Sequence, residues 1–209
     1  MTISASDSSR PRTKKRSTRS LSKRTRNTES LTSPTVHLHG VLVDVLGVGV
    51  LLLGKSGIGK SECALDLVMR GHRLVADDLI KVERSEEGKL YGSSHELGRH
   101  LMEIRGLGII DIGKLFGIAA TRDRKRIQLV IELVESDVEI KDLTGLEGES
   151  YEILGVRLPL RRIPVRPGRN LTAIVEVAAR EYLLEEEGYH TAAQLEERLI
   201  TKMREGGKE

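Results

Sequence analysis

Eight consecutive residues, from Gly54 to Ser61, constrain the fold of this chain more than any other feature. They match the pattern G-x-x-x-x-G-K-[ST], which predicts a phosphate-binding loop between a strand and a helix. The apolar run Val50–Leu53 precedes the loop, and a run typical of a helix extends from Lys60 to about Arg70, so both flanking elements are expected. Backbone N–H groups and the helix N-terminus surround phosphate oxygens in such loops. We therefore expect the chain to bind a nucleoside triphosphate or another polyphosphate.

Two side chains of this loop have distinct expected tasks. Lys60 neutralises the β- and γ-phosphates, and the Ser61 hydroxyl is positioned to bind Mg²⁺. The residues expected to bind the nucleotide are Gly54, Lys55, Ser56, Gly57, Ile58, Gly59, Lys60 and Ser61.

The remaining pattern mixes short strands with helices and predicts an α/β fold with a central sheet. Gly71 is placed to end the first helix. The expected strands are residues 37–46, 50–53, 74–76 and 127–134, and the expected helices are 60–70, one from Asn170 or Thr172 to about Glu187 that Gly188 closes, and a last one after a capping box at 191–194.

An acidic pair, Asp77 and Asp78, ends the short predicted strand Leu74–Ala76. Carboxylates in this position resemble the second acidic element of P-loop enzymes. Neighbouring residues of a strand point to opposite faces, so we expect the two carboxylates to have different tasks. One would orient a metal-bound water or Lys60, and the other would accept the proton of the phosphate acceptor. The alternative is a solvated turn at the end of the strand.

Four other positions have two interpretations each when the residues are considered alone. Glu103 precedes an apolar, glycine-rich run and is either a metal ligand or an ion-pair residue. His39 lies between apolar strand residues, which is more typical of a structural histidine. The turn 164–170 carries two arginines that either bind phosphate or are solvated. Cys63 is expected to be a small core residue and not a nucleophile.

Composition separates a basic N-terminal tail from the rest of the chain. Residues 1–36 hold nine Lys and Arg against Asp7 and Glu29, a net charge of +7, whereas the remaining 25 basic and 29 acidic residues give −4. The tail is rich in Ser and Thr and has few aliphatic residues, so we expect residues 1–36 to be disordered and residues 37–209 to form the folded domain. A basic arm either contacts nucleic acid or an acidic partner, or has no specific role.

Composition also excludes several classes of protein. No apolar run is long enough to span a bilayer, and the first residues lack the apolar stretch of a secretory signal. A single cysteine fits a reducing cytoplasm. Four Tyr, one Phe and no Trp leave little aromatic surface for stacking bases, which argues against binding of single-stranded nucleic acid.

Five stretches together resemble the catalytic domain of the HPr kinase/phosphorylase family and occur in the family's order. They are His39–Asp44, Gly54–Ser61, Gly71–Asp78, Glu103–Asp111 and Ile163–Asn170. The resemblance implies a P-loop kinase fold with a central mixed β-sheet, similar to phosphoenolpyruvate carboxykinase, in a cytoplasmic homohexamer. It also implies ATP- and Mg²⁺-dependent phosphorylation of a serine of the carrier protein HPr. The reverse reaction it implies is phosphorolysis of that phosphoserine by inorganic phosphate, which releases pyrophosphate.

The same resemblance implies a role for each matching residue. Asp78 is similar to the family's general base, which acts as the acid in the reverse reaction, and His39 is similar to the histidine that assists it. Lys60 matches the lysine of the phosphate loop, and Ser61 and Glu103 match the Mg²⁺ ligands. Asp77 and two segments complete the implied site: Met102, Glu103, Ile104, Arg105, Gly106, Leu107, Gly108, Ile109, Ile110 and Asp111 for both reactions, and Pro164, Val165, Arg166, Pro167, Gly168 and Arg169 for dephosphorylation.

The sequence departs from the family pattern in two places. The family has a separate domain before the catalytic one, whereas here the basic tail precedes His37. The family also has an arginine in an Asp-Arg-x-Gly segment where this chain has Leu143. Because an arginine at a phosphoryl-transfer site contributes about 10³–10⁵ in rate, we expect a slow kinase unless another arginine substitutes. The candidates are Arg122, Arg124, and Arg166 or Arg169 of a neighbouring subunit.

Two other functions remain open on the sequence alone. One is a P-loop kinase of the same fold with a different acceptor. The other is a catalytically impaired nucleotide-sensing module whose basic arm binds nucleic acid. Retention of Lys60, Asp78 and Glu103 argues against the sensor, because a sensor needs no general base.

Overall fold

The computed structural model describes residues 33–135 and 148–206. Within these ranges eight strands form one mixed sheet in the order β7-β4-β3-β1-β2-β8-β10-β9. The strands are β1 Thr35–Val45, β2 Val48–Gly54, β3 Arg73–Arg84, β4 Leu90–Ser94, β7 Arg124–Arg126, β8 Leu129–Glu135, β9 Glu149–Ile153 and β10 Val156–Val165. The helices are α1 Lys60–Met69, α2 Ile112–Phe116, α3 Leu171–Glu186 and α4 Thr191–Gly206, with 3₁₀ turns η1 Glu96–Gly98 and η2 Ile118–Ala120.

The centre of the sheet changes from antiparallel to parallel pairing beside β2. β1 pairs antiparallel with both β2 and β3, whereas β8 pairs parallel with β2 and with β10. A separate two-stranded sheet consists of β5 Leu101–Ile104 and β6 Gly108–Asp111. The predicted α/β class and the central mixed sheet are therefore confirmed.

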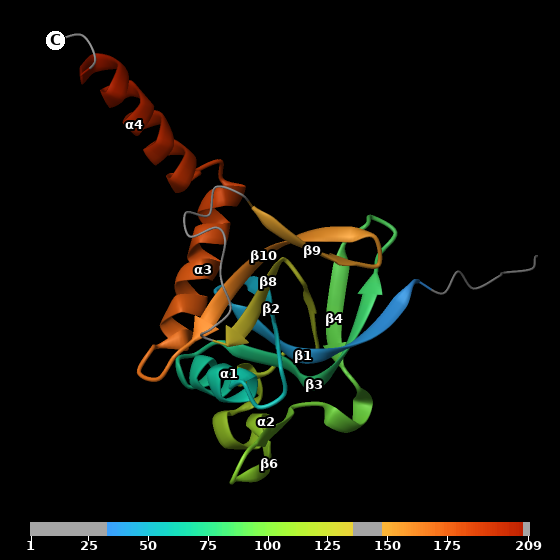
Figure 1. The fold of residues 1–209 in the computed structure, drawn as a ribbon. Helices are drawn as coiled ribbons and strands as arrows, with labels where there is room; N and C mark the ends of the chain where they lie inside the picture. Colours follow the sequence, from blue (N-terminus) through green and yellow to red (C-terminus); the bar gives the residue numbers. More distant parts are fainter. Residues whose placement is uncertain (1–32, 136–147, 207–209) are drawn as a thin grey trace, which may run out of the picture. The chain divides into compact units, whose positions relative to one another are not determined.

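Both faces of the central strands are buried, as their nearly continuous apolar sequences require. Val41 and Val43 of β1 belong to a core cluster that also contains Leu67 of α1 and Val175 of α3, so the helices cover this face (Figure 1). Leu42 belongs to a second cluster on the other face. Alternation along the strand thus divides one apolar run between two cores.

The second face is closed by the sheet itself. Leu90 of β4 and Ile153 of β9 belong to the same cluster, although their strands lie toward opposite edges of the sheet. The Arg84 guanidinium also donates a hydrogen bond to the carbonyl oxygen of Leu154 in the β9–β10 turn, at 3.0 Å. The sheet therefore curves strongly enough to bring its two ends together.

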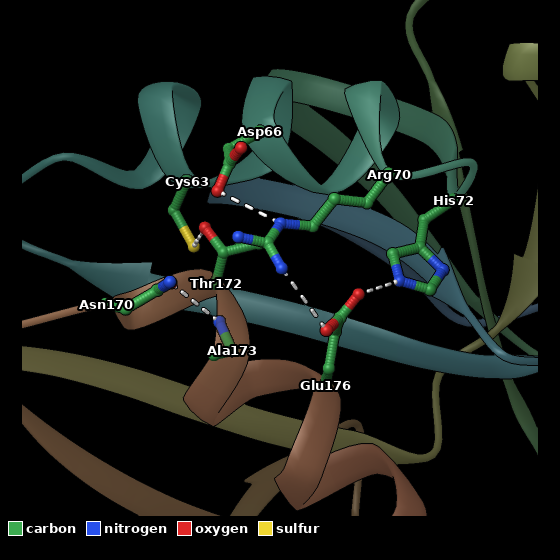
Figure 2. Close-up of polar contacts among 8 residues, drawn as sticks. All are labelled: Cys63, Asp66, Arg70, His72, Asn170, Thr172, Ala173 and Glu176. Carbon is green, nitrogen blue, oxygen red and sulfur yellow. Dashed lines mark hydrogen bonds and ion pairs between the residues drawn. The ribbon is translucent and has the colours of Figure 1, made fainter.

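Polar contacts join α1 to α3 on the helix-covered face (Figure 2). His72 Nε2 lies 2.8 Å from Glu176 Oε1, and Arg70 lies between Asp66 and Glu176. At the other end of α1, Cys63 Sγ lies 3.9 Å from Thr172 Oγ1. These contacts fix the helix that begins at the phosphate loop.

Several predicted boundaries are confirmed. α1 begins at Lys60, and Gly71 adopts a left-handed conformation (φ 94°) directly after its C-cap residue. Asn170, one of the two proposed caps, accepts the N–H of Ala173 through its side chain at 3.0 Å, so it is the N-cap of α3. Cys63 is buried, as expected for a core residue. The last helix is present, but Thr191 is its first helical residue and not the N-cap that the predicted capping box requires.

Other predictions are wrong. The short strand Leu74–Ala76 does not end at the acidic pair, because β3 continues to Arg84 and pairs with β1 over its whole length. Strands β4, β5, β6, β7, β9 and β10 were not predicted. Charged residues interrupt the apolar pattern in β7, β9 and β10, and β4 is a short segment with a glycine and two serines. β1 starts at Thr35, so the strand includes the last two residues that we assign to the tail.

No helix in the described ranges is long and apolar enough to cross a membrane.

Candidate active site

The phosphate loop connects β2 to α1 as the sequence predicts. β2 ends at Gly54 and α1 begins at Lys60. Gly59, the N-cap of α1, is left-handed (φ 102°), a conformation that residues with a Cβ rarely adopt. The Lys60 ammonium donates hydrogen bonds to the carbonyl oxygens of Gly54 and Lys55, each at 2.9 Å. An ammonium has three N–H donors, so one remains for an anion in the loop.

Asp77 joins the loop to the β5–β6 hairpin. Its Oδ1 accepts a hydrogen bond from the Ser61 hydroxyl at 2.9 Å, and its Oδ2 accepts one from the Glu103 backbone N–H at 3.1 Å. Burial raises the pKa of Asp77, and these hydrogen bonds oppose the shift. Asp77 therefore positions the predicted Mg²⁺ ligands Ser61 and Glu103 relative to each other.

Asp78 has a different neighbour and a different environment. Its Oδ1 lies 3.6 Å from Nδ1 of His39, and the two side chains are 80% and 82% exposed. The pair is close because β1 and β3 run antiparallel, with His39 opposite Leu79 and Gly40 opposite Asp78. An exposed carboxylate beside an imidazole is suited to accept a proton from an approaching hydroxyl.

One cavity of about 410 Å³ brings these groups together, and we call it the phosphate cavity. It is lined by His39, Gly40, Val41, Gly54, Ser56, Gly57, Gly59, Lys60, Ser61, Glu62, Asp77, Asp78, Glu103 and Arg105. All residues that we assign as catalytic or metal-binding are in this set. We expected the two aspartates to point to opposite faces, but both line this cavity.

The sequence did not single out Gly40, Val41 or Glu62. A signal was available for Gly40, since glycine is uncommon within an apolar strand and marks a close approach of another backbone. A Cβ at Gly40 would lie 2.7 Å from the carbonyl oxygen of Leu52. Val41 and Glu62 carry no such signal.

The segment 102–111 forms the β5–β6 hairpin and only part of it reaches the cavity. Met102 is buried in the core, whereas Glu103 and Arg105 line the cavity. Leu107 and Ile109 are exposed at the hairpin. The remaining members serve the fold or flank the turn: Ile104 and Ile110 pack against the core, Gly106 and Gly108 have positive φ, and Asp111 is the N-cap of α2.

The segment 164–169 does not line the phosphate cavity. Pro164 and Val165 end β10, where they pair with β8. Arg166, Pro167, Gly168 and Arg169 form the turn that leads to α3. Leu143, where the family has an arginine, lies outside the described residues, so the expectation attached to it stays a prediction.

The residues present fit a Mg²⁺ ion that is shared with a nucleotide. Among the described residues no three or more His, Cys, Asp or Glu side chains gather into a group that could hold a metal by themselves. Mg²⁺ commonly takes one or two carboxylates and completes its shell with water and substrate phosphates. The hard oxygen donors of Ser61, Asp77 and Glu103 form such an incomplete set.

A mixed sheet, a phosphate loop at the end of β2 and acidic residues on β3 define a P-loop kinase fold. A family model described as HPr Serine kinase C-terminal domain matches residues 30–199. The chain belongs to this family.

Curated relatives and a solved structure are similar to this chain. HPr kinase/phosphorylase of Geobacter sulfurreducens is 60% identical over 171 residues, which are 81% of this chain and 54% of that protein. The protein of the same name from Geobacillus thermodenitrificans is 52% identical over 195 residues, 93% of this chain and 63% of the relative. The chain thus spans about half to two thirds of their length. The structure of Hpr(Ser) kinase/phosphatase from Coxiella burnetii is 34% identical with a TM-score of 0.69, over 77% of this chain and 98% of that one.

Proposed function

We propose that this chain is the catalytic domain of a bifunctional HPr kinase/phosphorylase. It transfers the γ-phosphoryl group of ATP to a serine hydroxyl of the carrier protein HPr. It also removes the group by phosphorolysis with inorganic phosphate, which releases pyrophosphate. The observation that carries the proposal is the phosphate cavity, because it places an exposed acid–imidazole pair, Asp78 and His39, beside a complete phosphate loop. The names of the relatives support the choice of acceptor.

In the forward direction Asp78 accepts the proton of the serine hydroxyl while the serine oxygen forms its bond to the γ-phosphorus. The bond from that phosphorus to the bridging oxygen of ADP breaks, and Lys60 neutralises charge on the phosphates. His39 orients the Asp78 carboxylate across the 3.6 Å that separates them. In phosphorolysis Asp78 returns a proton to the serine oxygen as inorganic phosphate takes the phosphoryl group.

Two residues would hold the metal ion of the nucleotide, and a third would position them. Ser61 and Glu103 are its proposed ligands, and Asp77 holds both in place through its two carboxylate oxygens. Bound Mg²⁺ supplies neutralisation of the phosphate oxygens.

The nucleoside of ATP has room beside the loop. A second cavity of about 530 Å³ shares His39 and Gly54 with the phosphate cavity. Its lining combines Leu53, Ile58, Leu133, Val134 and Tyr151 with the charged residues Lys55, Glu132, Glu135 and Arg162. A mainly apolar and aromatic lining with a few polar groups is typical of small-molecule sites, and the apolar part of this cavity offers a surface for the base. The homohexameric assembly and the cytoplasmic location implied by the family belong to the same proposal.

The test is a phosphorylation assay with ATP, Mg²⁺ and purified HPr, in which mass spectrometry locates the modified serine. Lys60→Ala removes the charge partner of the phosphates and is expected to abolish the reaction, while the circular dichroism spectrum stays that of the parent. Addition of inorganic phosphate to the phosphorylated product should release pyrophosphate. Phosphorylation of another acceptor but not of HPr, or full turnover by Lys60→Ala, would contradict the proposal.

A further inference from the structure

Arg105 lies across the phosphate loop. It follows β5 directly and lines the phosphate cavity together with Lys60 and Asp78. A Cβ built on Gly57 of the loop would lie 2.8 Å and 3.3 Å from the two terminal guanidinium nitrogens of Arg105. The guanidinium therefore packs against the loop at Gly57, whose positive φ of 77° favours glycine at this position.

No hydrogen-bond or ion-pair partner holds Arg105 within the ranges that the structure describes. The other two basic groups at the cavity differ from it. The Lys60 ammonium is bound to loop carbonyls, and the imidazole of His39 lies beside Asp78. Arg105 thus offers a guanidinium whose N–H groups are available to a ligand of the loop.

Within the described part of one chain, the other arginines that were candidates for phosphoryl binding do not line the phosphate cavity of that same chain. Arg122 pairs with the buried carboxylate of Asp44. Arg124 lies over the ring of Tyr91, with its guanidinium carbon 4.3 Å from the ring centroid, and its NH2 lies 3.5 Å from Glu83.

Arg166 and Arg169 belong to the turn between β10 and α3. Arg169 donates a hydrogen bond back to the end of β10, to the carbonyl oxygen of Pro164 at 3.4 Å. Of the arginines in the described part of the chain, Arg105 alone lines the phosphate cavity.

We propose that Arg105 is a catalytic residue that binds the oxygens of the transferred phosphoryl group in both directions of the reaction. This inference rests on the proposed function. A guanidinium presents a planar fork of N–H donors that matches two phosphate oxygens. Charge spreads over the equatorial oxygens as the phosphoryl group moves between ADP and the serine, so the contact strengthens in the transition state. Arg105 would supply this stabilisation in a chain that has Leu143 where the family has an arginine.

The test compares the parent with Arg105→Ala, Arg105→Lys and a control, Arg99→Ala, in the full chain. Arg99 lies near the same hairpin, is 57% exposed and pairs with Asp123 at 3.6 Å, outside the cavity. Arg105→Ala is expected to lower kcat about 10³-fold or more, with KM for ATP within about threefold of the parent. Arg105→Lys should recover only part of kcat, because it keeps the charge but loses the fork. Arg99→Ala should behave as the parent.

A second measurement needs no acceptor protein. The measurement compares the affinity for ADP and Mg²⁺ with and without aluminium fluoride. Aluminium fluoride bound beside ADP mimics the phosphoryl group during transfer, whereas ADP with Mg²⁺ alone does not. Arg105→Ala should bind ADP as the parent does and lose the additional affinity that aluminium fluoride confers, which also shows that the variant is folded.

Three outcomes would overturn the assignment: a kcat within threefold of the parent, a raised KM with unchanged kcat, or retained tightening by aluminium fluoride. If instead the parent fails to phosphorylate HPr, the proposed function fails, and the fluoride experiment still decides the role of Arg105.

Discussion

The contact between His72 and Glu176 allows a quantitative prediction about how the phosphate-loop helix is held (Figure 2). The two side chains are 8% and 17% exposed, and Nε2 of His72 lies 2.8 Å from Oε1 of Glu176. A hydrogen bond to a charged group contributes about 1.5–3 kcal/mol. Loss of the acceptor also leaves a buried imidazole N–H without a partner, which costs about 1–3 kcal/mol by the same reasoning, and the two effects overlap.

We therefore expect Glu176→Ala to lower the free energy of unfolding by about 2–4 kcal/mol. The contact of Glu176 with Arg70 adds little, because Arg70 is 38% exposed and the atoms are 3.7 Å apart. Glu176→Gln retains an acceptor oxygen and should cost less, about 1 kcal/mol. Glu181→Ala is a matched control, since it is the same substitution at an exposed position of α3, and should change stability by less than about 0.5 kcal/mol.

The assay is urea unfolding followed by far-ultraviolet circular dichroism, because the chain contains no tryptophan for a fluorescence signal. A double-mutant cycle with His72→Ala isolates the pair and should give a coupling free energy of about 1.5–3 kcal/mol. A coupling below about 0.5 kcal/mol, or equal effects of Glu176→Ala and Glu181→Ala, would refute the reasoning.

Three further predictions follow from other positions. Asp78→Asn should lower kcat about 10²–10⁴-fold with unchanged Mg²⁺ dependence, whereas Glu103→Gln should raise the Mg²⁺ concentration for half-maximal rate; identical metal titrations would contradict this division. Burial raises the pKa of Cys63 to about 11 from 9.0, so at pH 8 about one thiol in 10³ is ionised instead of about one in ten, and a thiol reagent should react slowly until urea or rising pH exposes or ionises it. Gly49→Ala should prevent stable folding, because its Cβ would lie 1.8 Å from the carbonyl oxygen of Arg126, whereas Gly98→Ala, with open space around it, should leave the unfolding midpoint unchanged.

Local signals predicted the elements that form the phosphate loop. The loop pattern predicted the end of β2 and the start of α1, because this combination of glycines and a lysine is typical of the connection between a strand and a helix. Gly71 and Asn170 marked helix ends through their own backbone and side-chain chemistry.

The same local patterns could not predict which strands pair across long distances in the sequence. β9 and β10 alternate weakly because Glu149, Glu152, Arg157 and Arg162 interrupt their apolar residues. These strands are stabilised by their neighbours in the curved sheet, where Ile153 and Leu158 meet a core that the local sequence does not reveal.

The acidic pair shows why the site itself could be predicted only in part. The short apolar run Leu74–Ala76 predicts a strand that ends in the acidic pair, with the two carboxylates on opposite faces and a solvated turn as the alternative. In the structure β3 continues, and Asp78 has a left-handed backbone (φ 67°), a conformation that aspartate tolerates better than most residues. Regular alternation would place the two carboxylates on opposite faces. The irregular backbone at Asp78 interrupts that alternation, so Asp77 contacts Ser61 while Asp78 reaches His39 at the same cavity. Because this conformation depends on continued pairing with β1, the arrangement of metal-side and base-side carboxylates follows from the sheet and not from the Asp-Asp sequence alone.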